Sequence, residues 1–202
     1  KARRVALMLT GALLLGGCSS LNPFASTAKY PVLKPIENPI RVTEGWRVRV
    51  GDSAKFALQP VQAGGAVFAA GDESVSRIED GRVAWKTQLK TLVSGGVGSD
   101  GGLVVVGSPK GEVIALDAAS GQIKWRVAIN AEVLAAPSIA DGLVVVRSAD
   151  SRLFGLDASD GRQRWVYQRA NPPLALRSSA GVLLGTNAIL AGFPGGKLAA
   201  IN

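Results

Sequence analysis

Short apolar runs rich in β-branched residues recur along the second half of the chain. Leu103–Gly107 and Leu143–Arg147 both begin Leu-Val-Val-Val, and an Asp-Gly pair shortly precedes each run, at Asp100-Gly101 and Asp141-Gly142. Asp-Gly favours a tight turn, and a β-branched run after such a turn predicts a strand. Because the apolar positions are continuous rather than alternating, both faces of these strands are expected to be buried.

The sequence repeats with a period of about 40 residues. Its four tryptophans, the first of them Trp46, are spaced by 39, 40 and 40 residues. A large ring at one fixed place per repeat can fill the gap between neighbouring sheets, whereas Asp and Gly close the turn before it. We therefore interpret the repeated residues as core and turn positions rather than catalytic groups: Trp85, Trp125, Trp165, Asp117, Asp157, Gly81, Gly121 and Gly161.

Each repeat is predicted to contain about four short strands. In one repeat the run Glu112–Leu116 leads into a turn and then into Gln122–Val127, and beyond the first 17 residues no segment has a clear helical period. Such a small sheet must stack on neighbours to bury both faces, and this length and content are typical of a β-propeller blade. The sequence predicts an all-β fold, a partial β-propeller over residues 42–202 with about four blades of about 40 residues.

The first 17 residues predict an export signal. The apolar run Val5–Leu15 follows a cluster of basic residues and is shorter than the roughly 20 residues that a membrane-spanning helix needs. Leu15-Gly-Gly-Cys18 places small residues directly before the only cysteine, an arrangement that resembles a bacterial lipobox. The resemblance implies cleavage before Cys18, lipidation of this cysteine and, since Ser19 follows it, export to the outer membrane.

Residues 18–41 are expected to form a tether between the lipid and the folded body. Spaced prolines disfavour both helices and sheet ladders. The segment contains four of them, at Pro23, Pro31, Pro35 and Pro39.

The amino-acid composition limits the kinds of catalytic, metal-binding and disulfide chemistry that the chain can perform. The chain has no histidine, which removes the most common general acid–base residue and transition-metal ligand, and its single cysteine cannot form an internal disulfide. The formal net charge is +8, but three of the basic residues precede Cys18. Without a basic run or interleaved aromatic residues, nucleic-acid binding is not expected.

The repeat resembles a known family. Ala115-x-Asp117-x-x-x-Gly121-x-x-x-Trp125 is similar to the tryptophan-docking repeat of PQQ-type propellers, which occurs in periplasmic quinoprotein dehydrogenases and in the BamB lipoproteins of the outer-membrane β-barrel assembly machinery. The lipobox, the tether and a body that begins near Trp46 are similar to the BamB family. That resemblance implies an eight-bladed ring, of which this chain would form an open arc.

The dehydrogenase alternative has less support. Those enzymes commonly carry two adjacent cysteines and a calcium site of Asp, Glu and Asn, whereas this chain has no cysteine after Cys18. Its acidic pairs, Asp72-Glu73 and Glu79-Asp80, resemble turn residues. We expect no cofactor, no metal and no enzymatic activity.

The segment Arg169–Arg177 interrupts the repeat with two prolines followed by Leu-Ala-Leu-Arg. In extended backbone, Leu174 and Leu176 point to the same side, and two apolar anchors beside Arg177 suit an interaction hot spot. Periodicity alone fits equally well the first strand of the next blade, with both leucines in the core. Resemblance to the BamB family implies that these three residues contact the periplasmic domains of BamA, the central barrel subunit.

The resulting functional hypothesis is a lipid-anchored scaffold on the periplasmic face of the outer membrane. It would belong to the BAM complex, bind BamA, assist insertion of β-barrel proteins and meet unfolded outer-membrane proteins. The alternatives are a lipoprotein propeller that binds another cell-envelope ligand and, with less support, a fragment of a PQQ-dependent dehydrogenase.

Overall fold

The computed structural model of the chain describes residues 34–53, 55–170 and 180–202. The chain divides into two compact units at the boundary between Thr43 and Glu44. Residues 34–43, the described part of the first unit, are exposed and contain no strand. No helix among the described residues is long and apolar enough to span a membrane.

The described residues of the second unit form four antiparallel sheets, three with four strands and the last with three. In each of them the strands are paired in the order in which they occur along the chain. Their bounds are β1 (Val61–Ala63), β2 (Ala66–Ala70), β3 (Ser74–Glu79), β4 (Arg82–Gln88), β5 (Val97–Ser99), β6 (Leu103–Gly107), β7 (Glu112–Asp117), β8 (Ile123–Ala128), β9 (Ser138–Ala140), β10 (Leu143–Arg147), β11 (Arg152–Asp157), β12 (Gln163–Gln168), β13 (Leu183–Leu184), β14 (Ile189–Phe193) and β15 (Lys197–Ile201).

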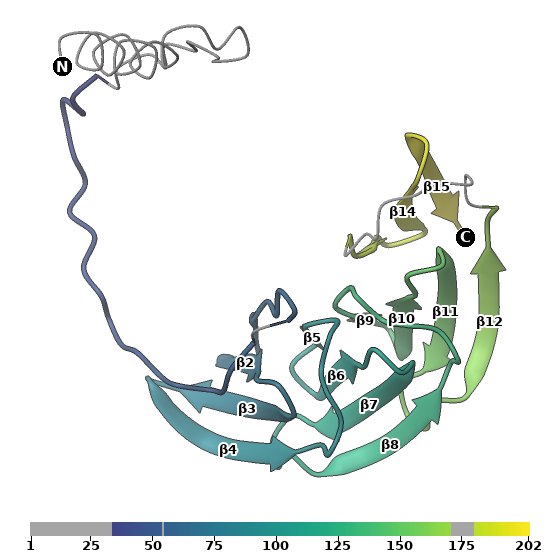
Figure 1. Ribbon diagram of the computed structural model, residues 1–202, viewed down its shortest axis with the longest axis horizontal. Helices are drawn as coiled ribbons and strands as arrows, with labels where there is room; N and C mark the ends of the chain where they lie inside the picture. The colour runs from purple at the N-terminus through teal and green to yellow at the C-terminus, as the bar shows by residue number, and fades with distance from the viewer. Residues whose placement is uncertain (1–33, 54, 171–179) are drawn as a thin grey trace, which may run out of the picture. The chain divides into compact units, whose positions relative to one another are not determined.

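Within this unit the sheets follow one another along an open arc (Figure 1). The last strands of the first three sheets, β4, β8 and β12, lie on its convex side, and β5 and β9 lie on the concave side. This arrangement confirms the predicted all-β propeller fold. Trp46 lies ahead of the first sheet, in residues 34–53, which contain no strand, so the four sheets begin after it.

The apolar core lies between neighbouring sheets. One cluster joins Phe68 and Val75 of the first sheet to Val104 and Ile114 of the second, and another joins the second sheet to the third. Every residue of β6 is buried, as the continuous apolar run predicts. Each sheet therefore depends on the next for burial of its faces, which is typical of a repeat architecture.

The same irregularity recurs in the first three sheets. The register of the last strand shifts just after Arg77, Ala115 and Gly155, the residues that pair with the three sheet tryptophans. A bulge adds local twist to a strand pair. Its recurrence beside the tryptophans shows that the repeat specifies backbone irregularity as well as side chains.

Candidate functional site

Each tryptophan packs on a glycine of the following repeat. Trp85 covers Gly121, where an added Cβ would lie 2.6 Å from Cδ2 of the indole, and Trp125 covers Gly161, where the nearest ring atom would be 2.7 Å away. Trp46 contacts Gly81 in the same way. Any side chain at these glycines would overlap the tryptophan. The regular spacing of Trp and Gly in the sequence therefore reflects contacts between neighbouring repeats.

Hydrogen bonds from the indole N–H groups stabilise the same contacts between tryptophans and the following repeats. Nε1 of Trp85 donates to the carbonyl oxygen of Ala118 at 3.1 Å, and Nε1 of Trp125 donates to that of Ala158 at 2.9 Å. A buried indole N–H needs an acceptor, and here a backbone carbonyl supplies one. The sequence does not identify these two alanines as acceptors, because the acceptor is a backbone oxygen that any residue would supply.

The two aspartates shape the turns that receive the rings. Oδ1 of Asp117 accepts the amide of Ser120 at 2.8 Å, and the backbone oxygen of Asp117 accepts the amide of Gly121 at 2.8 Å. Gly121 has a φ of 71°, the left-handed region that favours glycine. Asp and Gly at this spacing therefore form one turn, which presents the acceptor and the bare surface to the preceding tryptophan.

Asp157 makes the turn of the next repeat sensitive to acid. The hydroxyl of Ser159 and the guanidinium of Arg164 both donate to its carboxylate, at 2.6 and 2.7 Å, and these bonds hold the pKa of Asp157 well below its ordinary range. A carboxyl whose pKa is lower in the folded than in the unfolded state stabilises the fold above the unfolded-state value. That stability is lost as the pH falls toward the folded-state pKa.

We therefore expect Asp157→Asn to reduce the acid sensitivity of the protein. The wild type should lose stability progressively below about pH 5, and the variant should lose less of it, because it has no carboxylate to protonate at this turn. Urea midpoints at pH 7 and pH 3 measure the difference. Equal losses for the two proteins would show that Asp157 does not contribute to the pH dependence.

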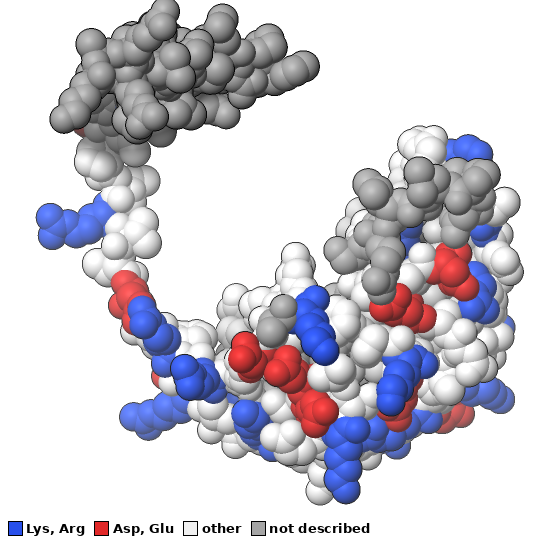
Figure 2. All heavy atoms as spheres, in the orientation of Figure 1, with Lys and Arg blue, Asp and Glu red and all other residues white. Residues whose placement is uncertain are grey.

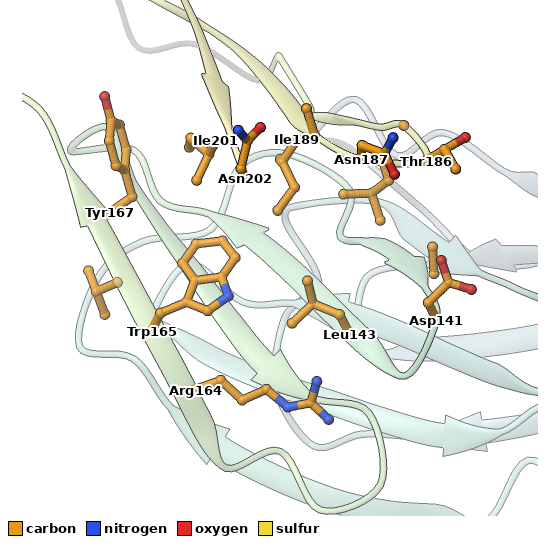
Figure 3. Close-up of a pocket in the computed structure, with 15 residues that line it drawn as sticks. Asp141, Leu143, Arg164, Trp165, Tyr167, Thr186, Asn187, Ile189, Ile201 and Asn202 are labelled. Atoms are coloured by element: carbon orange, nitrogen blue, oxygen red, sulfur yellow. The ribbon is translucent and has the colours of Figure 1, made fainter.

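Trp165 lines a cleft of about 600 Å³ beside the last sheet. Figure 3 shows Trp165 and Leu143 on one side, with Ile189 of β14 and Asn202, the residue after β15, on the other. At Trp85 and Trp125 the corresponding place is filled by the turn of the following repeat. The cleft thus lies at the place where, in the other two sheets, a turn of the following repeat packs on the tryptophan.

The surface in view carries both signs of charge. Figure 2 shows Lys and Arg interspersed with Asp and Glu over the second unit. No group of three or more His, Cys, Asp or Glu that could hold a metal ion lies within the part of the chain that the structure describes.

The connections between sheets differ in length. Residues 89–96 and 129–137 join the first three sheets, whereas residues 169–182 join the third sheet to the last and are five or six residues longer. The first two connections are fixed by buried valines, Val93 and Val133. The hydroxyl of Ser94 also donates to the carbonyl of Val133. The third connection is the one in which the sequence predicts a partner contact.

The predicted partner-contact residues, Leu174, Leu176 and Arg177, lie outside the described residues, as does the predicted lipidation site Cys18. The structure describes the end of the third connection from Ala180 onward. There Nη1 of Arg147 donates to the carbonyl of Ala180 at 3.3 Å, and the hydroxyl of Ser138 donates to that of Val182 at 2.9 Å. The third sheet thus holds the C-terminal end of this connection.

Sheets of four strands, linked by tryptophans that dock on the next repeat, define a β-propeller protein of the PQQ-type repeat class. A family model described as outer membrane protein assembly factor BamB matches residues 71–202. The chain belongs to the BamB family.

Curated relatives and a solved structure agree with this assignment. BamB of Bordetella pertussis is 38% identical over an alignment that covers 100% of this chain and 53% of that protein. BamB of Taylorella asinigenitalis is 46% identical, covering 99% and 53%. The crystal structure of BamB from Moraxella catarrhalis has a TM-score of 0.67 at 31% identity and covers 71% of this chain and 44% of that one. The chain spans about half the length of the curated relatives it matches.

Proposed function

We propose that this protein is a non-catalytic scaffold subunit of the outer-membrane protein assembly complex. It binds the periplasmic domains of BamA and assists insertion of β-barrel proteins into the outer membrane. The observation that carries the proposal is the family match over residues 71–202, which includes most of the second unit and the whole third connection. The relatives bear the name of an assembly factor.

The third connection supports BamA binding at Leu174, Leu176 and Arg177. It is longer than the two preceding connections and contains two leucines and an arginine after a proline pair. Apolar anchors beside a charged group are typical of interaction hot spots. Hydrogen bonds from Arg147 and Ser138 of the third sheet hold the C-terminal end of this connection, and such anchoring lowers the entropy lost on binding.

The proposal places the protein on the periplasmic face of the outer membrane, anchored through lipid on Cys18. Two or more acyl chains are needed for stable anchoring, since each buried methylene contributes only about 0.8 kcal/mol. Residues 18–41 then act as the tether. Unfolded outer-membrane proteins are the clients that such a position would bring within reach.

Binding of the complete mature protein to purified BamA periplasmic domains tests the proposal. We expect the wild type to bind and Leu174→Ala/Leu176→Ala/Arg177→Glu to lose at least about 100-fold in affinity, since it removes two anchors and reverses a charge. Calorimetry or surface plasmon resonance gives both dissociation constants. Thermal unfolding confirms that the variants compared are equally stable.

The control variant is Val83→Ala/Ile123→Ala/Lys124→Glu, which changes two exposed apolar residues and reverses one charge on β4 and β8. It should bind as the wild type does. Retained binding by the Leu174 variant would return its residues to a structural role. If neither the wild type nor the control binds, the BamA assignment fails, and tight binding of pyrroloquinoline quinone would favour the dehydrogenase alternative instead.

A further inference from the structure

The chain contains four Asp-Gly pairs, a sequence in which an aspartate can rearrange without an enzyme. They are Asp80-Gly81, Asp100-Gly101, Asp141-Gly142 and Asp160-Gly161. The backbone nitrogen of the glycine attacks the carboxyl carbon of the aspartate, and glycine has no Cβ to hinder this approach. The aspartate must rotate to bring the two atoms together, so contacts that hold the carboxyl group or the nitrogen slow the reaction. The fold therefore decides which pairs react.

Hydrogen bonds restrain the pair Asp100-Gly101. Oδ1 of Asp100 accepts the amides of Gly102 and Leu103 at 2.9 and 2.8 Å. The amide of Gly101 donates to the hydroxyl of Ser99 at 3.1 Å. Both the carboxyl group and the attacking nitrogen are thus held by other partners.

The pair Asp160-Gly161 is restrained in the same way and is covered as well. Oδ1 of Asp160 accepts the amide of Arg162 at 2.9 Å, and the amide of Gly161 donates to the carbonyl of Asp157 at 2.8 Å. Gly161 is buried under the ring of Trp125. Rotation at this pair would break the turn on which the tryptophan docks.

The pair Asp80-Gly81 is restrained by a side chain. It forms the two-residue turn between β3 and β4, and Asp80 is exposed. An added Cβ on Gly81 would lie only 2.8 Å from Cβ of Trp46. The tryptophan therefore limits how far this turn can rotate.

Asp141-Gly142 is the least restrained of the four pairs. It forms the two-residue turn between β9 and β10, where Ala140 pairs with Leu143, and both turn residues are exposed. Within the described residues, no hydrogen bond holds the carboxylate of Asp141 or the amide of Gly142. An added Cβ on Gly142 would meet no atom within 4 Å. Neither bonds nor packing oppose rotation at this turn.

We propose that Asp141 is a site of spontaneous isoaspartate formation. The nitrogen of Gly142 attacks the carboxyl carbon of Asp141: a C–N bond forms, a C–O bond breaks and one water molecule leaves, which gives a cyclic succinimide. Water then adds to the ring and opens it. When the bond between the nitrogen and the original backbone carbonyl carbon breaks, the chain continues through Cγ as isoaspartate. The water lost in the first step is regained in the second, so no other reactant is needed.

The rearrangement weakens the junction between the second and third sheets. Isoaspartate adds one atom to the backbone of a turn whose two residues fix the register of β9 and β10. The carbonyl of Gly142 accepts the amide of Ala158 at 3.0 Å, and the carbonyl of Ala158 accepts Nε1 of Trp125 at 2.9 Å. A shift of Gly142 therefore reaches the turn on which Trp125 docks.

Ageing of the complete mature protein at neutral pH tests the site. Electron-transfer fragmentation of proteolytic peptides distinguishes isoaspartate from aspartate at each pair. We expect isoaspartate to accumulate at Asp141 at least about tenfold faster than at Asp100 or Asp160, and at similar rates at all four pairs in denaturant, where no contact restrains them. Trp46→Ala should accelerate the reaction at Asp80 without changing it at Asp141, because it uncovers Gly81.

Thermal unfolding measures the consequence for the junction. Aged wild type should melt at a lower temperature than fresh wild type. Aged Asp141→Glu should keep its own fresh value, since glutamate must close a larger ring and reacts far more slowly.

Equal rates at Asp100, Asp141 and Asp160 in the folded protein would overturn the proposal. Isoaspartate at Asp141 without a fall in melting temperature would refute its effect on the junction. BamA takes no part in these measurements, so they stand or fail independently of the proposed function.

Discussion

Replacing Trp125 with alanine is expected to lower the free energy of unfolding by about 3–5 kcal/mol. The indole is 8% exposed and belongs to the cluster that joins the second sheet to the third. It also covers Gly161 and donates a hydrogen bond to Ala158. The substitution therefore removes apolar contacts, opens a cavity and leaves a carbonyl without its donor at a single junction between repeats. Urea denaturation followed by far-UV circular dichroism measures the change.

Two further variants separate the contributions to this loss. Trp125→Phe retains a ring without the N–H and should lose less, by about the contribution of one hydrogen bond plus the missing ring area. Trp46→Ala removes the same side chain from a position that is 50% exposed and should lose less still. If Trp125→Ala were no more damaging than Trp46→Ala, the tryptophan at the junction would not be a major source of stability.

Much of the fold follows from local sequence pattern. Continuous β-branched runs predict strands that are buried on both faces, and β6 is buried throughout. The 40-residue spacing predicts repeated sheets, because a side chain that fills the gap between blades must recur once per blade. These features depend on neighbours within the chain, so they can be recognised without coordinates.

Contacts between repeats could not be predicted in the same way. The sequence placed Gly121 four residues before Trp125, but in the structure this glycine lies under Trp85 of the preceding repeat. The carbonyl of Ala118 and the side chain of Arg147 act across sheets as well. Their partners are 33 residues away in the sequence, and no local pattern identifies them. The partner-contact residues remain predictions from resemblance.

The docking contacts also bear on the proposed partner contact in the third connection. Each tryptophan couples one repeat to the next, so the stability of a sheet depends on its immediate neighbours. The third connection begins after β12, which carries Trp165, and ends beside Arg147 of the same sheet. We therefore expect damage at the junction around Trp125 to weaken the proposed partner binding as well, through the third sheet.

Gly161→Ala is the second substitution with a large expected effect. Gly161 has a φ of 77°, which costs a residue with a Cβ about 1–2 kcal/mol, and the new methyl would lie 2.7 Å from Cε3 of Trp125. Overpacking of this kind typically adds about 1–3 kcal/mol. The same urea titration should show the combined loss.

Gly142→Ala separates the two costs, because Gly142 has a φ of 72° and no atom within 4 Å of an added Cβ. It should lose only the conformational part. Combining Gly161→Ala with Trp125→Ala gives a second separation: without the ring, the glycine substitution should cost less than it does alone, although Cγ1 of Val127 would still lie 2.9 Å from the new methyl. The two effects should therefore be strongly non-additive, since the two residues are in direct contact. Simple additivity would mean that the ring and the glycine do not form one docking unit, and the account of how adjacent repeats are joined would have to be abandoned.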